Sequence, residues 1–168
     1  MVEPQTHLFE DDGVIPNHPT FPLLIYPRAV ELTGPDPAAV FETLFRENGW
    51  GGSWRNGVFS FPHYHAEAHE VLGVYSGSAR IQLGGGSGIV AEVQPGDVVV
   101  IPAGVGHENL GFSAGFGVVG AYPPGQDPDV QRGAPDERNW VLNAIAKVPL
   151  PDTDPVYGVD GPLRSHWQ

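Results

Sequence analysis

The chain has 168 residues, no cysteine, and 8 basic against 20 acidic side chains, which gives a formal net charge of −12. The length suits one domain, and the lack of thiols excludes a disulfide scaffold, a thiolate metal site and a cysteine nucleophile. Because nucleic acids and anionic membranes are bound through clustered Lys and Arg, the acidic balance argues against both as partners.

Residues 1–20 are polar and interrupted by prolines, and they predict an extended N-terminal arm. The start of the arm has neither the basic nor the apolar region of a signal peptide, so we expect a cytoplasmic protein. Alternating β-formers then follow over residues 21–32. The prolines in this stretch, Pro22 and Pro27, predict edge strands, because proline cannot donate a hydrogen bond to a neighbouring strand.

A helix is predicted over residues 37–48, where the apolar side chains recur with a helical period. Asp36 and Pro37 suit its N-cap and first position, and Gly49 stands just past its end. We expect this helix to pack on the outside of a β core. A second short helix is predicted over residues 136–147.

Short β-type runs separated by turn residues occupy the middle of the chain, which is the pattern of a sandwich or barrel. The clearest runs are Glu70–Tyr75, Ala79–Leu83, Ile89–Val93, Val98–Ile101 and Gly117–Tyr122. We therefore predict a barrel over residues 21–122 and a C-terminal extension, residues 123–168, that packs on it. Two aromatic residues of the extension, Tyr157 and Trp167, either cover the barrel mouth or, as we expect, pack on the outside.

Four histidines fall in the β region, two of them at His63 and His65. On a strand, residues two apart project from the same face. If this run pairs with the strand that starts at Glu70, the carboxylate lies beside both imidazoles, and closure of the sheet brings His107 to the same point. His69 competes with Glu70 for that place. Since neighbours on a strand point to opposite faces, we favour Glu70 as the ligand and His69 as an outer-face residue or a partner of the ligands.

Such a set of nitrogen and oxygen donors suits one divalent transition-metal ion, which would be Fe, Mn, Ni, Co, Cu or Zn. Two stretches of the chain carry the donors in a wider spacing pattern. They read Gly57-x5-His63-x-His65-x4-Glu70-x6-Gly77 and Gly96-x5-Pro102-x-Gly104-x2-His107. This pattern resembles the paired motifs of the cupin superfamily, in particular a single-domain bacterial branch with Pro-rich ends. It departs at one place, because the family pattern has Asn four residues after the last histidine, where Gly111 stands here.

The resemblance implies an all-β fold, a double-stranded β-helix (cupin jelly-roll barrel) with one or two short peripheral helices and extended Pro-rich ends. It also implies that the barrel mouth holds the metal ion on His63, His65, Glu70 and His107. We expect a small-molecule substrate, and a homodimer built from the arm, the first helix and the tail.

Three functions are compatible with this site. The first hypothesis is a metal-dependent oxidoreductase of the dioxygenase type, acting on a small polar organic molecule. The alternatives are a metal-dependent isomerase or lyase, and a non-catalytic module that binds a metal or a small molecule. Candidates for a catalytic acid or base are His69, Tyr122 and Glu108. Arg80 would bind a substrate carboxylate if its strand face lined the barrel, although most charged residues face outward.

Overall fold

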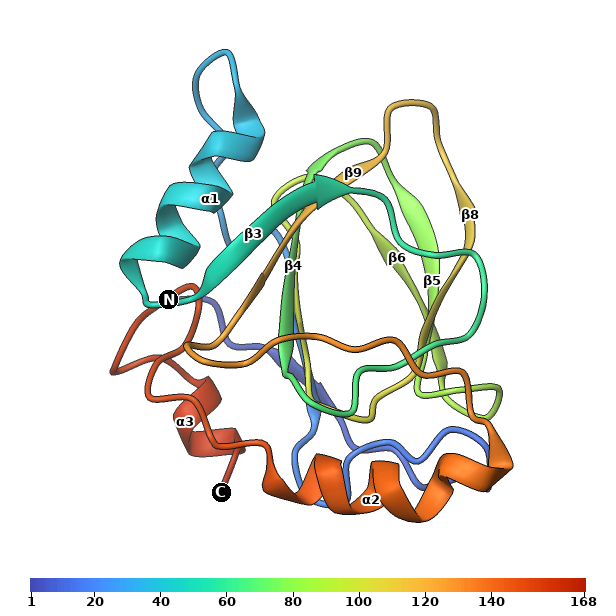
Figure 1. The fold of residues 1–168 in the computed structure, drawn as a ribbon. Helices are drawn as coiled ribbons and strands as arrows, with labels where there is room; N and C mark the ends of the chain where they lie inside the picture. The colour runs from blue at the N-terminus through green and yellow to red at the C-terminus, as the bar shows by residue number, and fades with distance from the viewer.

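The computed structural model describes residues 1–168 and consists of nine strands with a few short helices (Figure 1). The strands are β1 (Gln5–His7), β2 (Leu23–Tyr26), β3 (Gly51–Asn56), β4 (Glu70–Ser76), β5 (Ala79–Leu83), β6 (Ile89–Val93), β7 (Val98–Ile101), β8 (His107–Phe112) and β9 (Gly117–Tyr122). The helices are α1 (Pro37–Glu47), α2 (Arg138–Lys147), α3 (Leu163–His166) and the 3₁₀ turn η1 (Pro135–Glu137). None of the helices is long and apolar enough to cross a lipid bilayer.

The strands form two antiparallel sheets that pack face to face, which confirms the predicted all-β jelly-roll fold. One sheet has six strands in the order β1-β2-β7-β4-β9-β3, and the other has three in the order β6-β5-β8. Alternation along the central strands decides which side chains enter the space between the sheets. On β4, Leu72 and Val74 belong to the cluster of 12 buried residues between the sheets. Val71 belongs to a cluster of 14 on the outer face of the six-stranded sheet.

Helix α1 covers the outer face of the six-stranded sheet with the buried rings of Phe41 and Phe45 (Figure 1). It begins at Pro37 and ends one residue before the predicted bound. Asp36 occupies the N-cap position, but its side chain makes no capping hydrogen bond. Instead its carboxylate accepts hydrogen bonds from the guanidinium of Arg55 at 3.0 and 3.1 Å. Asp36 and Pro37 therefore hold the predicted N-cap and first positions, while the Asp36 side chain binds Arg55 and not the helix backbone.

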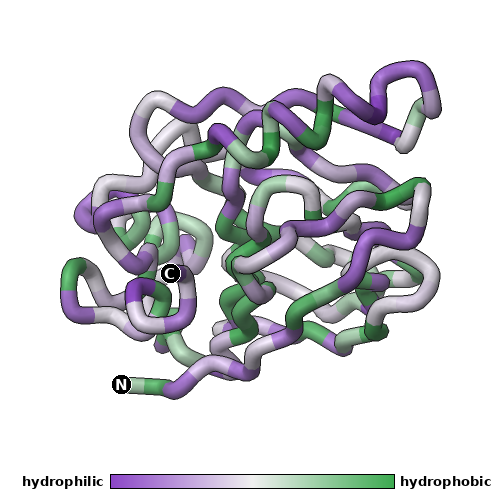
Figure 2. Tube along the Cα trace, turned by 90° about the horizontal axis from the view of Figure 1, so that it is seen from below, coloured by the Kyte–Doolittle hydropathy of each residue, from purple (hydrophilic) through white to green (hydrophobic).

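The two ends of the chain are part of the folded structure. In the arm, β1 pairs with β2, so β2 lies between β1 and β7. The prediction that this stretch forms an edge strand is therefore wrong. Pro22 and Pro27 stand just outside it, where no ladder hydrogen bond is lost. Helix α2 lies below the barrel (Figure 1) and buries Val141 and Ile145 against residues of the arm and the barrel. Seen from that side, many of the apolar segments lie towards the middle of the molecule (Figure 2).

Candidate metal centre

The segment that carries His63 and His65 is held by two backbone bridges, one to the barrel and one to the C-terminal extension. His63 and His107 exchange hydrogen bonds between their backbones, with N···O distances of 3.2 and 2.9 Å. Tyr64 does the same with Gln131 of the C-terminal extension, at 3.0 and 2.9 Å. The predicted pairing of this segment with the strand starting at Glu70 is therefore wrong. The reason is that both edges of β4 are already used, by β7 and β9.

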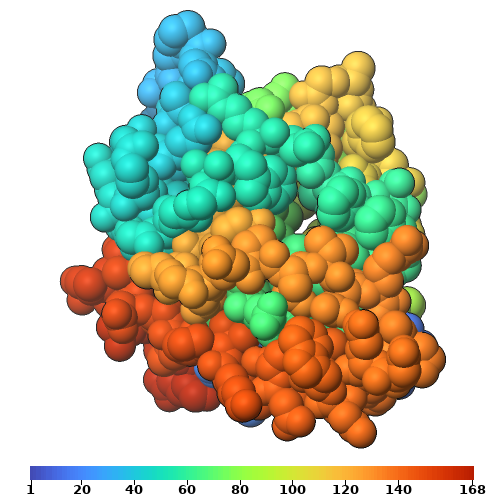
Figure 3. All heavy atoms as spheres, in the orientation of Figure 1, coloured from blue at the N-terminus to red at the C-terminus, as the bar shows by residue number.

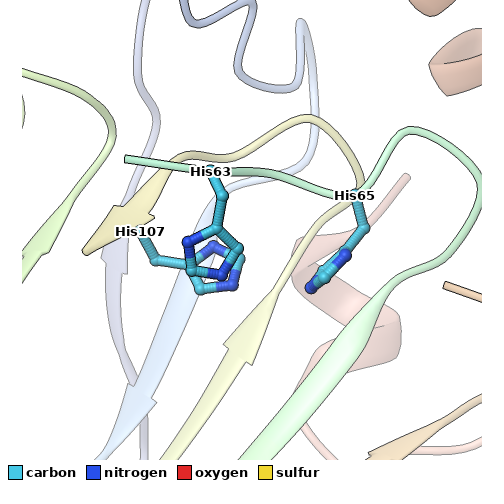
Figure 4. A group of neighbouring side chains, drawn as sticks. All are labelled: His63, His65 and His107. Atoms are coloured by element: carbon cyan, nitrogen blue, oxygen red, sulfur yellow. The ribbon is translucent and has the colours of Figure 1, made fainter. Parts of the chain in front are cut away.

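The same bridges nevertheless bring the predicted donors together. The imidazoles of His63, His65 and His107 are buried, and one nitrogen from each lies within 4.8 Å of the others (Figure 4). Glu70, the first residue of β4, faces the same point because it lies on the strand face of Leu72. Its Oε1 is 3.4 Å from Nε2 of His65 and 3.4 Å from Nε2 of His107. The loop segment before β4 and the first residues of β4 and β8 thus meet at one buried position.

Each imidazole is oriented by a backbone carbonyl at its Nδ1 atom. Nδ1 of His63 lies 3.0 Å from the carbonyl of Phe61, and Nδ1 of His107 lies 3.1 Å from that of Val105. Nδ1 of His65 contacts the carbonyl of Asp129. A carbonyl oxygen only accepts hydrogen bonds, so the proton of each neutral ring belongs on Nδ1. The lone pair of every Nε2 is then free to coordinate.

The electrostatics of the group favour a cation. Burial alone would raise the pKa of Glu70, but the imidazoles of His65 and His107 hold it well below its usual range, so the carboxylate is ionised. Burial and the nearby His107 ring lower the pKa of His63 to about 3, so this ring is neutral. Burial alone would lower the pKa of His65, but the negative charge of Glu70 outweighs this effect, so the pKa of His65 is raised. Imidazole nitrogens beside a buried carboxylate are the donors that first-row divalent ions bind, so these residues fit a metal.

A cavity of about 340 Å³ opens beside these donors and has Leu72 and the two aromatic residues Trp54 and Tyr122 in its wall. In the space-filling view, a hollow lies between the residues that follow β3 and those that follow β9 (Figure 3). The indole N–H of Trp54 donates a hydrogen bond of 2.7 Å to the Tyr122 hydroxyl oxygen. Burial, and then the Glu70 carboxylate, raise the pKa of Tyr122, so its hydroxyl stays protonated.

Of the four residues considered for catalysis, only Tyr122 lines this cavity. His69 is buried on the opposite side of β4, where its ring lies 4.8 Å from that of Trp167 and its Nδ1 accepts the N–H of Ala103 at 2.9 Å. Arg80 lies on the outer face of β5, because the alternate residues of that strand fill the core between the sheets. Glu108 likewise alternates with the buried His107 on β8 and lines a separate outer depression.

The C-terminal extension contributes residues to the site that the sequence did not point to. Pro128 and Val130 line the cavity, and the carbonyl of Asp129 holds His65. The extension crosses the front of the barrel after β9 (Figure 1). No local signal marks this segment, since every residue has a carbonyl and the contact joins positions 64 residues apart. Trp167 packs on the far side of the six-stranded sheet and does not cover the cavity.

Comparison with known proteins places this geometry in context. The family model described as Cupin matches residues 54–147. The uncharacterized protein YjlB of Bacillus subtilis (strain 168) is 44% identical over 165 residues, which cover 98% of this chain and 97% of that protein. A cadmium-containing acireductone dioxygenase from Bacillus anthracis aligns with a TM-score of 0.41 at 17% identity, over 64% of this chain and 82% of its own. A cupin 2 domain-containing protein from Halorhodospira halophila aligns with a TM-score of 0.37 at 18% identity, over 89% of this chain and 83% of that protein.

Proposed function

Because the chain belongs to the cupin family, we propose that it is a metal-dependent enzyme acting on a small organic molecule. In this proposal His63, His65, Glu70 and His107 bind one divalent transition-metal ion. The observation that carries it is the convergence of the three imidazoles, each with its Nδ1 beside a backbone carbonyl, while Nε2 of His65 and Nε2 of His107 lie 3.4 Å from the Glu70 carboxylate. A bound ion would act as a Lewis acid, and as a redox centre if it were iron, manganese or copper.

The residues around the cavity would bind and orient the substrate. Leu72 and Val58 provide an apolar wall that excludes water from a bound molecule. Trp54 donates its N–H to the oxygen of Tyr122, so the hydroxyl proton of Tyr122 is left for the Glu70 carboxylate or, when a substrate is bound, for an oxygen atom of the substrate. Because the pKa of this hydroxyl is raised, it serves as a hydrogen-bond donor and not as a base. Tyr122 is thus our candidate for the orienting residue.

Elemental analysis of protein purified without added metal and without a His tag tests the metal site. We expect about one transition-metal ion per chain, and its loss in His63→Ala and His65→Ala. His166→Ala is the matched control, since His166 lies on α3 and its ring contacts Glu3 at the surface. Folded protein that retains no transition metal contradicts the proposal. A Glu70→Ala variant with unchanged metal affinity would remove Glu70 from the ligand set.

Our first choice of reaction is oxidation by dioxygen, as in a dioxygenase. It is supported by the ligand set, which lacks thiolates and suits Fe(II). The hypothesis predicts that anaerobically loaded Fe(II) protein consumes O₂ with a substrate from a broad panel, and the absence of any uptake counts against it. An isomerase or lyase would instead work with Zn(II) and be indifferent to oxygen. A binding module would return every ligand unchanged.

We also propose that the protein is a cytoplasmic homodimer. The outer face of the three-stranded sheet supports the dimer, because β6 and β8 expose Val90 and Leu110 there at 44% and 45%. A second copy would cover these side chains. Light scattering after gel filtration should give twice the chain mass of 18.0 kDa. A monomer at micromolar concentration would refute the dimer without affecting the metal site.

A further inference from the structure

The wall of the cavity carries no positive side chain. None of its 13 lining residues is Lys or Arg, and Glu70 is the only acidic one. The basic residues are placed elsewhere. Arg80 is on the outer sheet face, Arg55 pairs with Asp36 and Glu42 beside α1, and the guanidinium of Arg132 stacks on Phe61 in a position outside the cavity wall. A negatively charged ligand therefore finds no protein cation to pair with.

The lack of a basic side chain in the cavity wall limits the charge of a ligand if the proposed metal site is occupied. Two positive charges of the ion and one negative charge of Glu70, with three neutral imidazoles, leave one net positive charge at the site. A ligand with one negative charge neutralises it. A dianion would leave an uncompensated negative charge in a partly apolar cavity, and burying an unpaired charge is costly.

The remaining surface suits an apolar body. Six of the 13 lining residues are hydrophobic, and the volume of about 340 Å³ lies at the small end of ligand cavities. Tyr122 offers one neutral hydroxyl donor, fixed by Trp54. We infer, resting on the proposed function, that the cavity takes a small ligand with an apolar body that chelates through a singly charged pair of oxygens, such as an enolate beside a carbonyl. Dicarboxylates are the class it rejects.

Two probes isolate the charge. Acetylacetone, bound as its enolate after releasing a proton to the buffer, and malonate present the same O–C–C–C–O chelate with the same number of non-hydrogen atoms. They differ in that two methyl groups of the first are replaced by carboxylate oxygens in the second. Calorimetric titration of metal-loaded protein, with the metal content measured on the same sample, compares them. We expect acetylacetone to bind at least about tenfold more tightly than malonate.

Equal or tighter binding of malonate overturns the inference, and so does a failure of both probes to bind protein that contains metal. Protein that takes up no metal contradicts the proposed function itself, so the two failures are distinguished by the metal content.

A matched pair of variants tests whether the charge of the cavity wall causes the difference in affinity. Val130→Arg adds a cation at an exposed position of the cavity wall and should raise the affinity for malonate, whereas Val159→Arg adds the same charge at an exposed turn outside the cavity wall and should not. An identical response of the two variants contradicts the explanation by wall charge.

Discussion

The three imidazoles of the site are oriented by main-chain atoms, and the strength of that orientation depends on how firmly each carbonyl is held. The carbonyls of Phe61 and Val105 belong to residues two positions before the histidines they contact. The carbonyl that holds His65 belongs to Asp129, on a distant segment. That segment is fixed by the Asp129 carboxylate, which accepts the N–H groups of Ala66 and Glu67, each at 2.9 Å.

Removing this carboxylate should weaken the metal site without touching a ligand. In Asp129→Ala the two N–H groups lose their acceptor, and the carbonyl that orients His65 becomes free to move. We expect metal affinity to fall by about 10- to 100-fold, as is typical when a group that orients a ligand is lost. Competition with a chelator measures this. Asp127→Ala is the control, since Asp127 is exposed and its loss changes the charge equally. Equal losses in both variants would show that only charge is involved.

The spacing of the histidines predicted which side chains meet, although the strand pairing expected to bring them to Glu70 does not form. Alternation along β4 was enough to predict that Glu70 and His69 face opposite ways. Both patterns are local. The orientation by Asp129 was not predictable, because it depends on where a loop more than 60 residues away comes to lie. The ligand roles themselves stay predictions until metal is measured.

His18 provides a prediction on pH. Its Nδ1 accepts the N–H groups of Thr20 and Phe21 at 3.2 and 2.9 Å, so the ring must be unprotonated there. Burial lowers the pKa of His18 to about 4, and the titratable group that faces it, His69, has a pKa lowered by burial to about 3. An unfolded histidine has a pKa of about 6.5, so below that pH the unfolded state takes up protons first and stability falls as pH falls.

The contribution of His18 to the free energy of unfolding is thus complete above about pH 6.5 and is lost towards pH 4, by at most about 1.4 kcal/mol per pH unit. His18→Asn keeps an acceptor for the same N–H groups but does not titrate. Urea unfolding at pH 7 and pH 5 should show a smaller loss of stability for the variant than for the wild type. The same loss in both proteins would contradict a role for His18.

Among the elements, α1 and β4 approach closely because β4 has no side chain at Gly73. A Cβ atom at this position would lie 2.5 Å from the ring of Phe41. Gly73→Ala should therefore destabilise the fold by about 1–3 kcal/mol, the usual cost of overpacking a rigid core. Gly111→Ala on β8 is the control, because a Cβ there meets nothing within 4 Å, and it should change stability by less than about 0.5 kcal/mol. Chemical denaturation measures both, and equal effects would contradict the packing argument.

The elements differ in how well the sequence predicts them. The strands β5, β6, β7 and β9 have the bounds predicted, since alternating or continuous apolar residues mark them. Strand β3 was not predicted, because most of its residues are exposed and two are glycines, and it forms only through pairing with β9. Helix α3 was missed for a similar reason, since four residues are too few to give a periodic pattern.

Over the whole molecule, the cavity and the joined chain ends lie on opposite sides of the six-stranded sheet. On the side away from the cavity, Trp167 stacks on Phe21 at 5.1 Å, and its indole N–H donates to the carbonyl of Pro22 at 2.8 Å. Nearby, the buried Asp154 carboxylate accepts hydrogen bonds from the Tyr26 hydroxyl and from the backbone of Leu163. The hydrogen bonds of Trp167 with Pro22 and of Tyr26 with Asp154 join segments more than 120 residues apart, which no local sequence pattern encodes.

The separation predicts that stability and metal binding can be changed independently. Trp167 is fully buried, so Trp167→Ala should cost about 3–5 kcal/mol of unfolding free energy through the lost transfer term and the cavity left behind. Because its partners lie across the sheet from the donors, the folded variant should bind metal with unchanged stoichiometry. Trp140→Ala, at a tryptophan of α2 that is 50% exposed, is the matched control and should cost much less. A Trp167→Ala protein that is folded but has lost its metal would show that the chain ends and the site are coupled through the sheet.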